Sequence, residues 1–180
     1  PRGLSTLRDG MGTMADALLR AVREQGEVHF RHTVTRIDRR AGQWHLTFAN
    51  GAGAKAGHLL LAIPPRAAAA LLGPIDPEAA ALLGSIVLAS NLSVSLAYGP
   101  PAVTHDLAAS GLVVAPGEPT SGGLRACTFS SSKFGNRAPP GTVLLRAFFR
   151  PDATEIGAPD PDWVGRTTQA LGKILGISTL

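Results

Sequence analysis

The pattern of apolar and polar positions in the first third of the chain predicts one helix followed by short strands. Apolar residues recur at helical spacing from Met11 to Val22, charged residues occupy the other face, and Gly26 follows the last turn. Strands are predicted where β-branched residues gather or apolar and polar residues alternate, at residues 28–31, 33–38 and 43–48. The pairs Ala41-Gly42 and Asn50-Gly51 are typical of the turns between such strands.

Residues 58–63 differ from the strands before them because almost every position is apolar. This pattern predicts a strand that is buried on both faces of a sheet. A helix, a set of strands and one such buried strand together indicate an α/β arrangement.

The rest of the chain predicts a second, mainly antiparallel sheet with helices. Two short helices are expected at residues 67–72 and 77–83, the second with Asp76 as its N-cap and Pro77 at its first position. A final helix is expected at residues 162–175. Strands are expected between these helices, at residues 86–98, 111–115, 123–131 and 142–150. The predicted fold class is therefore α/β (α+β).

Composition narrows the class of protein. The chain has 180 residues, of which 44% are apolar and 17% charged, with a mean hydropathy of +0.14, so it should fold around a core rather than remain disordered. No apolar run reaches the length of a bilayer span. Cys127 is the one cysteine, which excludes an internal disulfide and a CxxC metal site and favours a reducing compartment. Its apolar, mid-strand position predicts an inert buried thiol.

The net charge of +4 is unevenly distributed. Residues 1–66 hold ten basic and five acidic residues and carry +5, whereas residues 67–180 carry −1. The change falls at Pro64-Pro65, which we interpret as a boundary between two parts of the chain. A nucleic-acid partner is not expected, because the chain has no recognition motif and only 5% aromatic residues.

Common catalytic patterns are missing. Ser130, Ser131 and Ser132 form a run without the GxSxG turn of a nucleophilic serine. The five histidines never occur in an HxH or HExxH spacing, so no metal site is predicted. The glycine-rich pieces at residues 10–12 and 51–53 lack both the Walker ending and the GxGxxG pattern. The residues alone therefore indicate a two-part α/β chain without an acid–base or nucleophilic site.

The beginning of the chain suggests that it is part of a longer polypeptide. It opens on Pro-Arg-Gly-Leu, with neither an initiator Met nor the pattern of a signal peptide. We therefore expect part of any binding site to lie outside these residues.

Several segments carry a resemblance to a known family. Residues 7–18 (LRDGMGTMADAL) are similar to the GGM-x-x-L-x-x-A-L segment of the flavin-dependent amine oxidase and protoporphyrinogen oxidase superfamily. Residues 33–37, 44–46 and 60–65 (LLAIPP) follow in the order and at the separations of that family. Residues 110–116 (SGLVVAP), 126–134 (ACTFSSSKF), 137–139 and 141–148 resemble the substrate-domain sheet of bacterial protoporphyrinogen and coproporphyrinogen oxidases.

The resemblance implies two partial domains and a flavin cofactor. Residues 1–66 would be part of a Rossmann-like FAD-binding domain, and residues 67–180 part of a substrate-binding domain. The backbone of Val34 matches the position that contacts the adenine of FAD, while Ala62 and Pro64 match the crossover near the cofactor. Val34 could equally be an ordinary core residue. The GxGxxG segment and the C-terminal flavin segment of the family do not occur here, so the chain alone is not expected to bind FAD completely.

For the substrate, the resemblance implies contacts from two strands. Gly111, Leu112 and Val113 match the strand over the reactive side of the flavin, and Ala147 matches a position that faces the tetrapyrrole. Apolar residues suit contact with a broad, hydrophobic macrocycle. For Leu112 and Val113, packing in the protein core is the alternative role. Arg146 or Arg125 could contribute a basic rim for the substrate's carboxylates.

The implied activity is oxidation of a porphyrinogen to a porphyrin in heme biosynthesis, with oxygen as the acceptor; coproporphyrinogen and protoporphyrinogen both remain open. Two alternatives also stay open, an amine oxidase or carotenoid desaturase of the same superfamily and a catalytically silent binding domain. A cytoplasmic location is expected, with peripheral membrane contact and oligomeric state left open.

Overall fold

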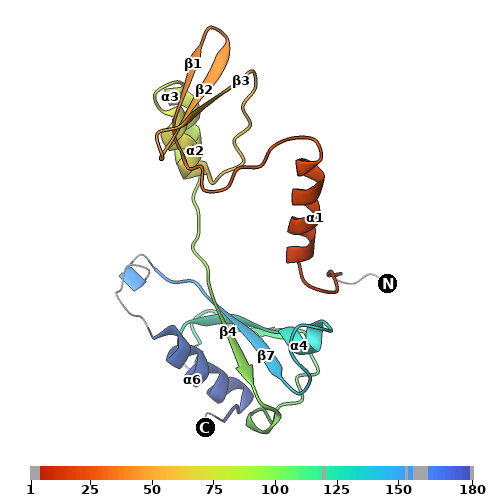
Figure 1. The fold of residues 1–180 in the computed structure, drawn as a ribbon. Coiled ribbons are helices and arrows are strands. Elements are labelled where there is room, and N and C mark those ends of the chain that lie inside the picture. The colour runs from red at the N-terminus through yellow and green to blue at the C-terminus, as the bar shows by residue number, and fades with distance from the viewer. Residues whose placement is uncertain (1–4, 119–120, 153, 156–161, 179–180) are drawn as a thin grey trace. The chain divides into compact units, whose positions relative to one another are not determined.

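The computed structural model describes residues 5–118, 121–152, 154–155 and 162–178, which form two compact units (Figure 1). The small unit is residues 21–88, and the large unit combines residues 1–20 with residues 89–180. Helix α1 (Gly12–Arg23) contains the boundary in its last turn. The compact units therefore do not coincide with the expected functional division after residue 66, because residues 67–88 belong to the small unit.

The small unit is an antiparallel sheet with two helices. Strands β1 (Val34–Arg40), β2 (Gln43–Phe48) and β3 (Gly53–Ala56) lie in the order β1-β2-β3. The turn between β1 and β2 is Ala41-Gly42, with φ values of 49° and 79° at the two residues, as a tight two-residue hairpin turn requires. Helix α2 (Pro65–Leu72) contacts β1 and packs against α3 (Pro77–Gly84).

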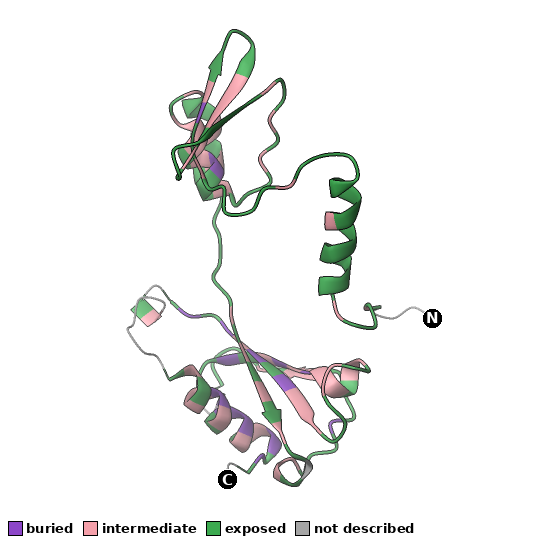
Figure 2. Cartoon of the chain, viewed as in Figure 1, coloured by how far each residue is buried: buried purple, intermediate pink, exposed green. Residues whose placement is uncertain are grey.

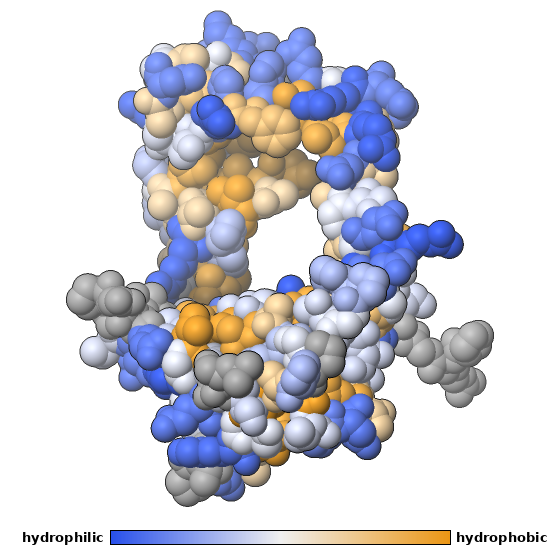
Figure 3. Space-filling view, turned by 60° about the horizontal axis from the view of Figure 1, so that its bottom comes forward, coloured by the Kyte–Doolittle hydropathy of each residue, from blue (hydrophilic) through white to orange (hydrophobic). Residues whose placement is uncertain are grey.

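Local signals in the sequence correctly placed the helices α1 and α3. The Asp76 carboxylate accepts a hydrogen bond from the Ala79 N–H at 2.9 Å, so the predicted N-cap of α3 is confirmed. Helix α1 is also confirmed, and its apolar residues Met14, Leu18 and Val22 are about half exposed. Apolar side chains of this kind are visible at the surface of both units in Figure 3.

Two predicted strands of the small unit are wrong. Residues 28–31 form no strand, and Arg31 has a φ of 61°, which interrupts an extended backbone. Residues 58–63 are also outside any strand, and Leu60 is 90% exposed. A strand that is buried on both faces needs neighbouring strands and covering helices, and none of the described strands pairs with residues 58–63. Strand β3, in contrast, was not predicted.

The large unit contains an antiparallel sheet in the order β4-β7-β6-β5. The strands are β4 (Leu92–Tyr98), β5 (Gly111–Val113), β6 (Leu124–Phe129) and β7 (Val143–Phe149). A 3₁₀ turn, η1 (Pro100–Ala102), follows β4, and a short helix, α4 (Ser130–Lys133), follows β6. The expectation of a mainly antiparallel sheet with helices is confirmed for this unit.

Helix α6 (Trp163–Leu175) covers one face of this sheet (Figure 1). Its N-cap, Asp162, accepts from the Gly165 N–H at 2.7 Å, and Gly176 follows its last turn with a φ of 64°. In the large unit, the buried residues in Figure 2 gather where α6 meets the sheet. They include Cys127, Leu145, Ala147, Phe149, Ala170 and Leu171.

The lengths of two strands differ from the prediction for reasons of pairing. Strand β4 begins at Leu92 rather than at residue 86, since Leu92 lies opposite Phe149, the last residue of β7. No strand in the described ranges therefore pairs with residues 86–91, and Val87 is 91% exposed. The chain leaves β6 at Phe129 and turns into α4 rather than continuing as a strand to residue 131.

Arg166 on α6 ties this helix to two other segments. Its Nη1 lies 2.7 Å from Glu155 Oε1, and its Nη2 donates to the Gly122 carbonyl at 3.0 Å. The guanidinium carbon is 4.3 Å from the centre of the Trp163 ring, a cation–π contact. The Arg166 hydrogen bond, followed by the Asp152 backbone N–H, lowers the pKa of Glu155.

We expect Glu155→Gln to lower the melting temperature of the protein at neutral pH but not in acid. A carboxyl group whose pKa is lower in the folded state stabilises above its unfolded pKa, and this contribution disappears as pH falls through the folded pKa. The wild-type and variant melting curves should thus converge between about pH 5 and about pH 3. Glu24→Gln, an exposed change in the turn that follows α1, is the matched control. A gap between the melting temperatures that stays constant with pH would contradict this role of the Glu155 charge.

Candidate functional site

The face of the large sheet opposite α6 is open and carries an ordered set of side chains. Strand pairing aligns Ser95, Arg146, Thr128 and Gly111 in one row across all four strands. A second row on this face contains Ser93, Phe148, Ala126 and Val113. The row between them contains Val94, Ala147, Cys127 and Leu112, and its side chains pack into the covered core.

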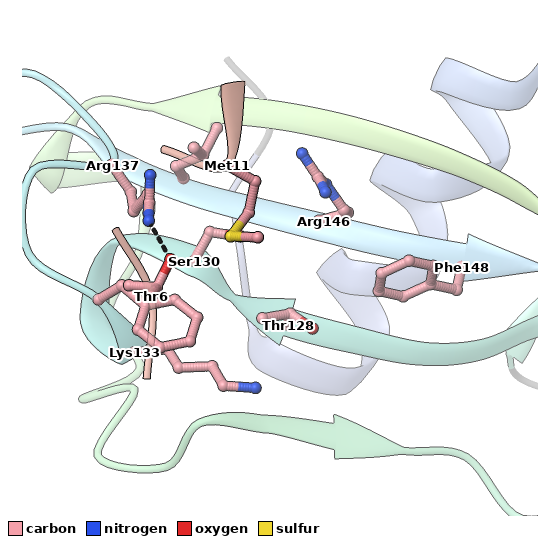
Figure 4. A pocket seen from close by; sticks show the side chains of 10 residues that line it. Thr6, Met11, Thr128, Ser130, Lys133, Arg137, Arg146 and Phe148 are labelled. Carbon is pink, nitrogen blue, oxygen red and sulfur yellow. Dashed lines mark hydrogen bonds between the residues drawn. The ribbon is translucent and has the colours of Figure 1, made fainter. Parts of the chain in front are cut away.

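A pocket of about 480 Å³ lies on this open face (Figure 4). Its floor comes from Thr128 of β6 and from Leu144, Arg146 and Phe148 of β7. The remaining lining residues come from α4, the segment after it and the N-terminal segment: Ser130, Lys133, Phe134, Arg137, Thr6 and Met11. The Ser131 hydroxyl accepts from the Leu144 N–H at 3.0 Å and holds α4 against β7.

Arg137 joins the two distant segments of this pocket. It donates hydrogen bonds to the Thr6 hydroxyl and, at 2.8 Å, to the Leu7 carbonyl. Phe134 lies beside two cations, since its ring centre is 5.8 Å from the Arg137 guanidinium carbon and 5.4 Å from Lys133 Nζ. Both contacts are of the cation–π type.

The pocket is positively charged. Lys133, Arg137 and Arg146 line it, and no acidic residue does. In the described part of the chain, none of these three cations has a carboxylate within 4.0 Å. Met11, Phe134, Leu144 and Phe148 supply an apolar wall. Such a pocket suits a ligand that combines an apolar body with acidic groups.

The structure separates the four predicted substrate residues. Val113 is 85% exposed and lies with Gly111 in the open-face rows, whereas Leu112 is partly buried against the core. Ala147 is 0% exposed and packs beneath the sheet with α6, so its side chain does not reach the open face. Leu144, Arg146 and Phe148 are the β7 residues that do.

The three predicted cofactor residues come together in the small unit. Val34, Ala62 and Pro64 line one hollow of about 630 Å³, together with Leu59–Ile63 and residues of α2. The Thr33 carbonyl accepts from the Ala49 N–H at 2.9 Å. Because successive residues of a strand point their peptide groups to opposite sides, the N–H and C=O of Val34 face the outer edge of β1, where no described strand lies.

These features fit part of a flavin nucleotide. A free peptide donor and acceptor beside small apolar side chains can recognise the edge of an adenine ring while the ring lies against the apolar surface. The role of Val34, Ala62 and Pro64 in binding the cofactor remains a prediction. All three residues line the same hollow.

Other candidate groups do not form a reactive site. Burial raises the pKa of the Cys127 thiol to about 11, in agreement with the predicted inert thiol. Among the described residues there is no group of three or more His, Cys, Asp or Glu side chains that could hold a metal ion. Nor does any helix in the described ranges have the length and apolar character needed to cross a membrane.

The sequence indicated one of the pocket's cations and missed two. Arg146 and Arg125 were the suggested basic residues, and only Arg146 is among the lining residues. Lys133 and Arg137 were not singled out, because their proximity to Arg146 depends on how α4 and the following segment return to β7. The alternation of β7 could have identified Leu144 and Phe148 as the companions of Arg146.

Comparisons with known proteins identify the family of this chain. The family model described as flavin containing amine oxidoreductase matches residues 1–179. Coproporphyrinogen III oxidase of Propionibacterium freudenreichii subsp. freudenreichii is 36% identical over 176 residues, which are 96% of this chain and 32% of that protein. Protoporphyrinogen oxidase 1, chloroplastic, of Arabidopsis thaliana is 24% identical and is matched over 81% of this chain and 28% of that protein.

A solved structure shows the same fold. The crystal structure named "Putative protoporphyrinogen oxidase" from Exiguobacterium sp. 255-15 aligns with a TM-score of 0.77 and 26% identity, over 97% of this chain and 37% of that chain. The chain thus spans about a third of the length of the relatives that it matches. The match to the family model over almost all residues decides the assignment: this chain belongs to the flavin-containing amine oxidoreductase family.

Proposed function

We propose that the full-length protein is an FAD-dependent oxidase that converts a porphyrinogen into the corresponding porphyrin in heme biosynthesis, with oxygen as the final electron acceptor. The observation that carries the proposal is the 36% identity to a coproporphyrinogen III oxidase over 96% of the chain. The open-face pocket supports it, since it combines an apolar wall with cations and a porphyrinogen combines an apolar macrocycle with carboxylate side chains.

The residues of this chain would bind and orient rather than react. When bound, FAD would accept the hydride that leaves a carbon of the substrate ring. Val34, Ala62 and Pro64 would hold part of the cofactor, and the open face of the large sheet would hold the substrate. This division of work fits the described residues, which form no metal cluster or reactive thiol.

The division of the chain into a cofactor part, residues 1–66, and a substrate part, residues 67–180, is likewise part of this proposal. The N-terminal segment lies within the cofactor part but also lines the pocket of the large sheet, through Thr6 and Met11. We therefore propose that the N-terminal segment contributes to substrate binding although it precedes the cofactor residues.

The test is reconstitution of the full-length protein with FAD. Coproporphyrinogen III and protoporphyrinogen IX are supplied separately in air, and porphyrin fluorescence is followed. The expected result is a flavin absorbance spectrum and porphyrin formation from at least one substrate. A flavoprotein that leaves both substrates unchanged would favour an amine oxidase or desaturase of the same family, whereas a protein without flavin would favour a silent binding domain.

We expect Val34→Pro to weaken flavin binding about tenfold, since proline removes the backbone N–H that faces the free edge of β1. Proline is tolerated on the outer side of an edge strand, so the sheet should persist. The measurement is the dissociation constant for FAD from flavin fluorescence, with Val34→Ile as the control that keeps the N–H. Equal affinities of the two variants would remove Val34 from the cofactor site.

A further inference from the structure

The cations of the open-face pocket differ in how far protein groups already engage them. Arg137 donates to Thr6 and Leu7 and lies beside Phe134, so it holds the wall of the pocket together. Within the described residues, the Arg146 side chain donates one hydrogen bond, from Nε to the Ser95 hydroxyl at 3.3 Å. Lys133 contacts the Phe134 ring, and across the described ranges no side-chain or backbone acceptor takes a hydrogen bond from its ammonium group.

The bond from Arg146 Nε to Ser95 leaves the terminal nitrogens of the guanidinium group available. Such a fork can donate two parallel hydrogen bonds to one carboxylate. Lys133 enters the same pocket from α4, and Figure 4 shows Lys133 and Arg146 on opposite sides of Thr128. Ser130 and Thr128 add hydroxyl groups that can donate to an anion.

Like charges that share one pocket without a counter-charge repel one another. The pocket contains Lys133, Arg137 and Arg146 and no acidic lining residue. An anionic ligand would relieve this repulsion, and the apolar wall of Leu144 and Phe148 requires that its acidic group be attached to an apolar body.

We propose that Lys133 and Arg146 form a carboxylate-binding subsite for one of the two propionate side chains of coproporphyrinogen that are vinyl groups in protoporphyrinogen, which makes the enzyme prefer the substrate with more carboxylates. Arg137 is a positioning residue that secures the N-terminal wall of this subsite. This inference rests on the proposed function, since it assigns the substrate of the same site.

The test uses the full-length, FAD-loaded protein and porphyrins as probes. The dissociation constants of coproporphyrin III, with four carboxylates, and protoporphyrin IX, with two, are measured by fluorescence quenching. Lys133→Met and Arg146→Met should each weaken coproporphyrin binding about fivefold, and both variants should lose much of the preference for coproporphyrin over protoporphyrin. Lys133→Arg, which keeps the charge, should restore the preference.

Two controls remove a cation of the same unit that does not line the pocket, Lys173→Ala on α6 and Arg125→Ala on β6. These should bind both porphyrins as the wild type does. Unchanged coproporphyrin affinity in Lys133→Met and Arg146→Met, with normal flavin content, would overturn the subsite while the oxidase activity of the wild type stands. A wild-type protein that neither binds nor oxidises any porphyrin would instead refute the proposed function, and the subsite with it.

Discussion

Gly111→Ala should lower the free energy of unfolding by about 3 kcal/mol, the upper part of the range for overpacking. A Cβ atom at this position would lie 2.3 Å from the Cys127 carbonyl oxygen and 3.1 Å from Thr128 Cα. Both neighbours are backbone atoms of β6, so they cannot move away without separating β5 from the sheet. Gly111 also has a φ of 155°, which disfavours a side chain further.

The measurement is the melting temperature of the full-length, FAD-loaded protein. Gly135→Ala is the matched control, because a Cβ at Gly135 would meet no atom within 4 Å. If Gly111→Ala left the melting temperature unchanged and altered only substrate affinity, position 111 would need glycine for contact with the ligand rather than for packing of the strands. We expect the opposite, since Gly111 allows the close approach of β5 and β6.

Ala147→Leu should destabilise the protein by about 2 kcal/mol, because the side chain has no free volume to enter. Ala147 is 0% exposed and lies in one row with Val94, Cys127 and Leu112, beneath α6. Larger side chains at this position must therefore displace α6 or the neighbouring strands. This prediction follows from the core position of Ala147 and competes with its assignment to the substrate.

Val113→Leu is the comparison that separates the two roles. Val113 is 85% exposed on the open face, so a larger side chain there should leave the melting temperature unchanged. Both variants are compared by melting temperature and by KM for the porphyrinogen. A stable Ala147→Leu protein with an increased KM would show that Ala147 faces the ligand, whereas loss of stability without a selective change in KM supports its place in the core.

The helices and the tight hairpin were predictable because their signals are local. Apolar spacing places α1 and α6, the Asp76 carboxylate caps α3, and the Ala41-Gly42 turn joins β1 to β2. Each of these features depends on residues within one or two turns of chain. The family resemblance could also be read from short segments, and the match over residues 1–179 confirms it.

Contacts between distant residues were not predictable in the same way. The apolar run at residues 58–63 has the composition of a buried strand but lacks a described partner strand, and β4 is limited to the residues that β7 can pair. Periodicity reports which residues prefer to be buried, but it does not specify what covers them. The assignment of Ala147 to the substrate came from the family resemblance alone, which does not report that this side chain packs in the core beneath α6.

The amino-acid sequence thus specified helices α1, α2, α3 and α6, the turns, the family and the apolar character of the substrate strands, since these depend on local preferences and on ordered motifs. Folding of the large sheet placed Lys133, Arg137 and Arg146 around one pocket and joined Arg137 to Thr6, which lies 131 residues earlier in the chain. The clustering of these cations could not be predicted from a sequence pattern, because the proximity of two cations depends on strand register and on the path of the connecting segments. The pocket that we propose for substrate carboxylates is therefore a property of the folded chain.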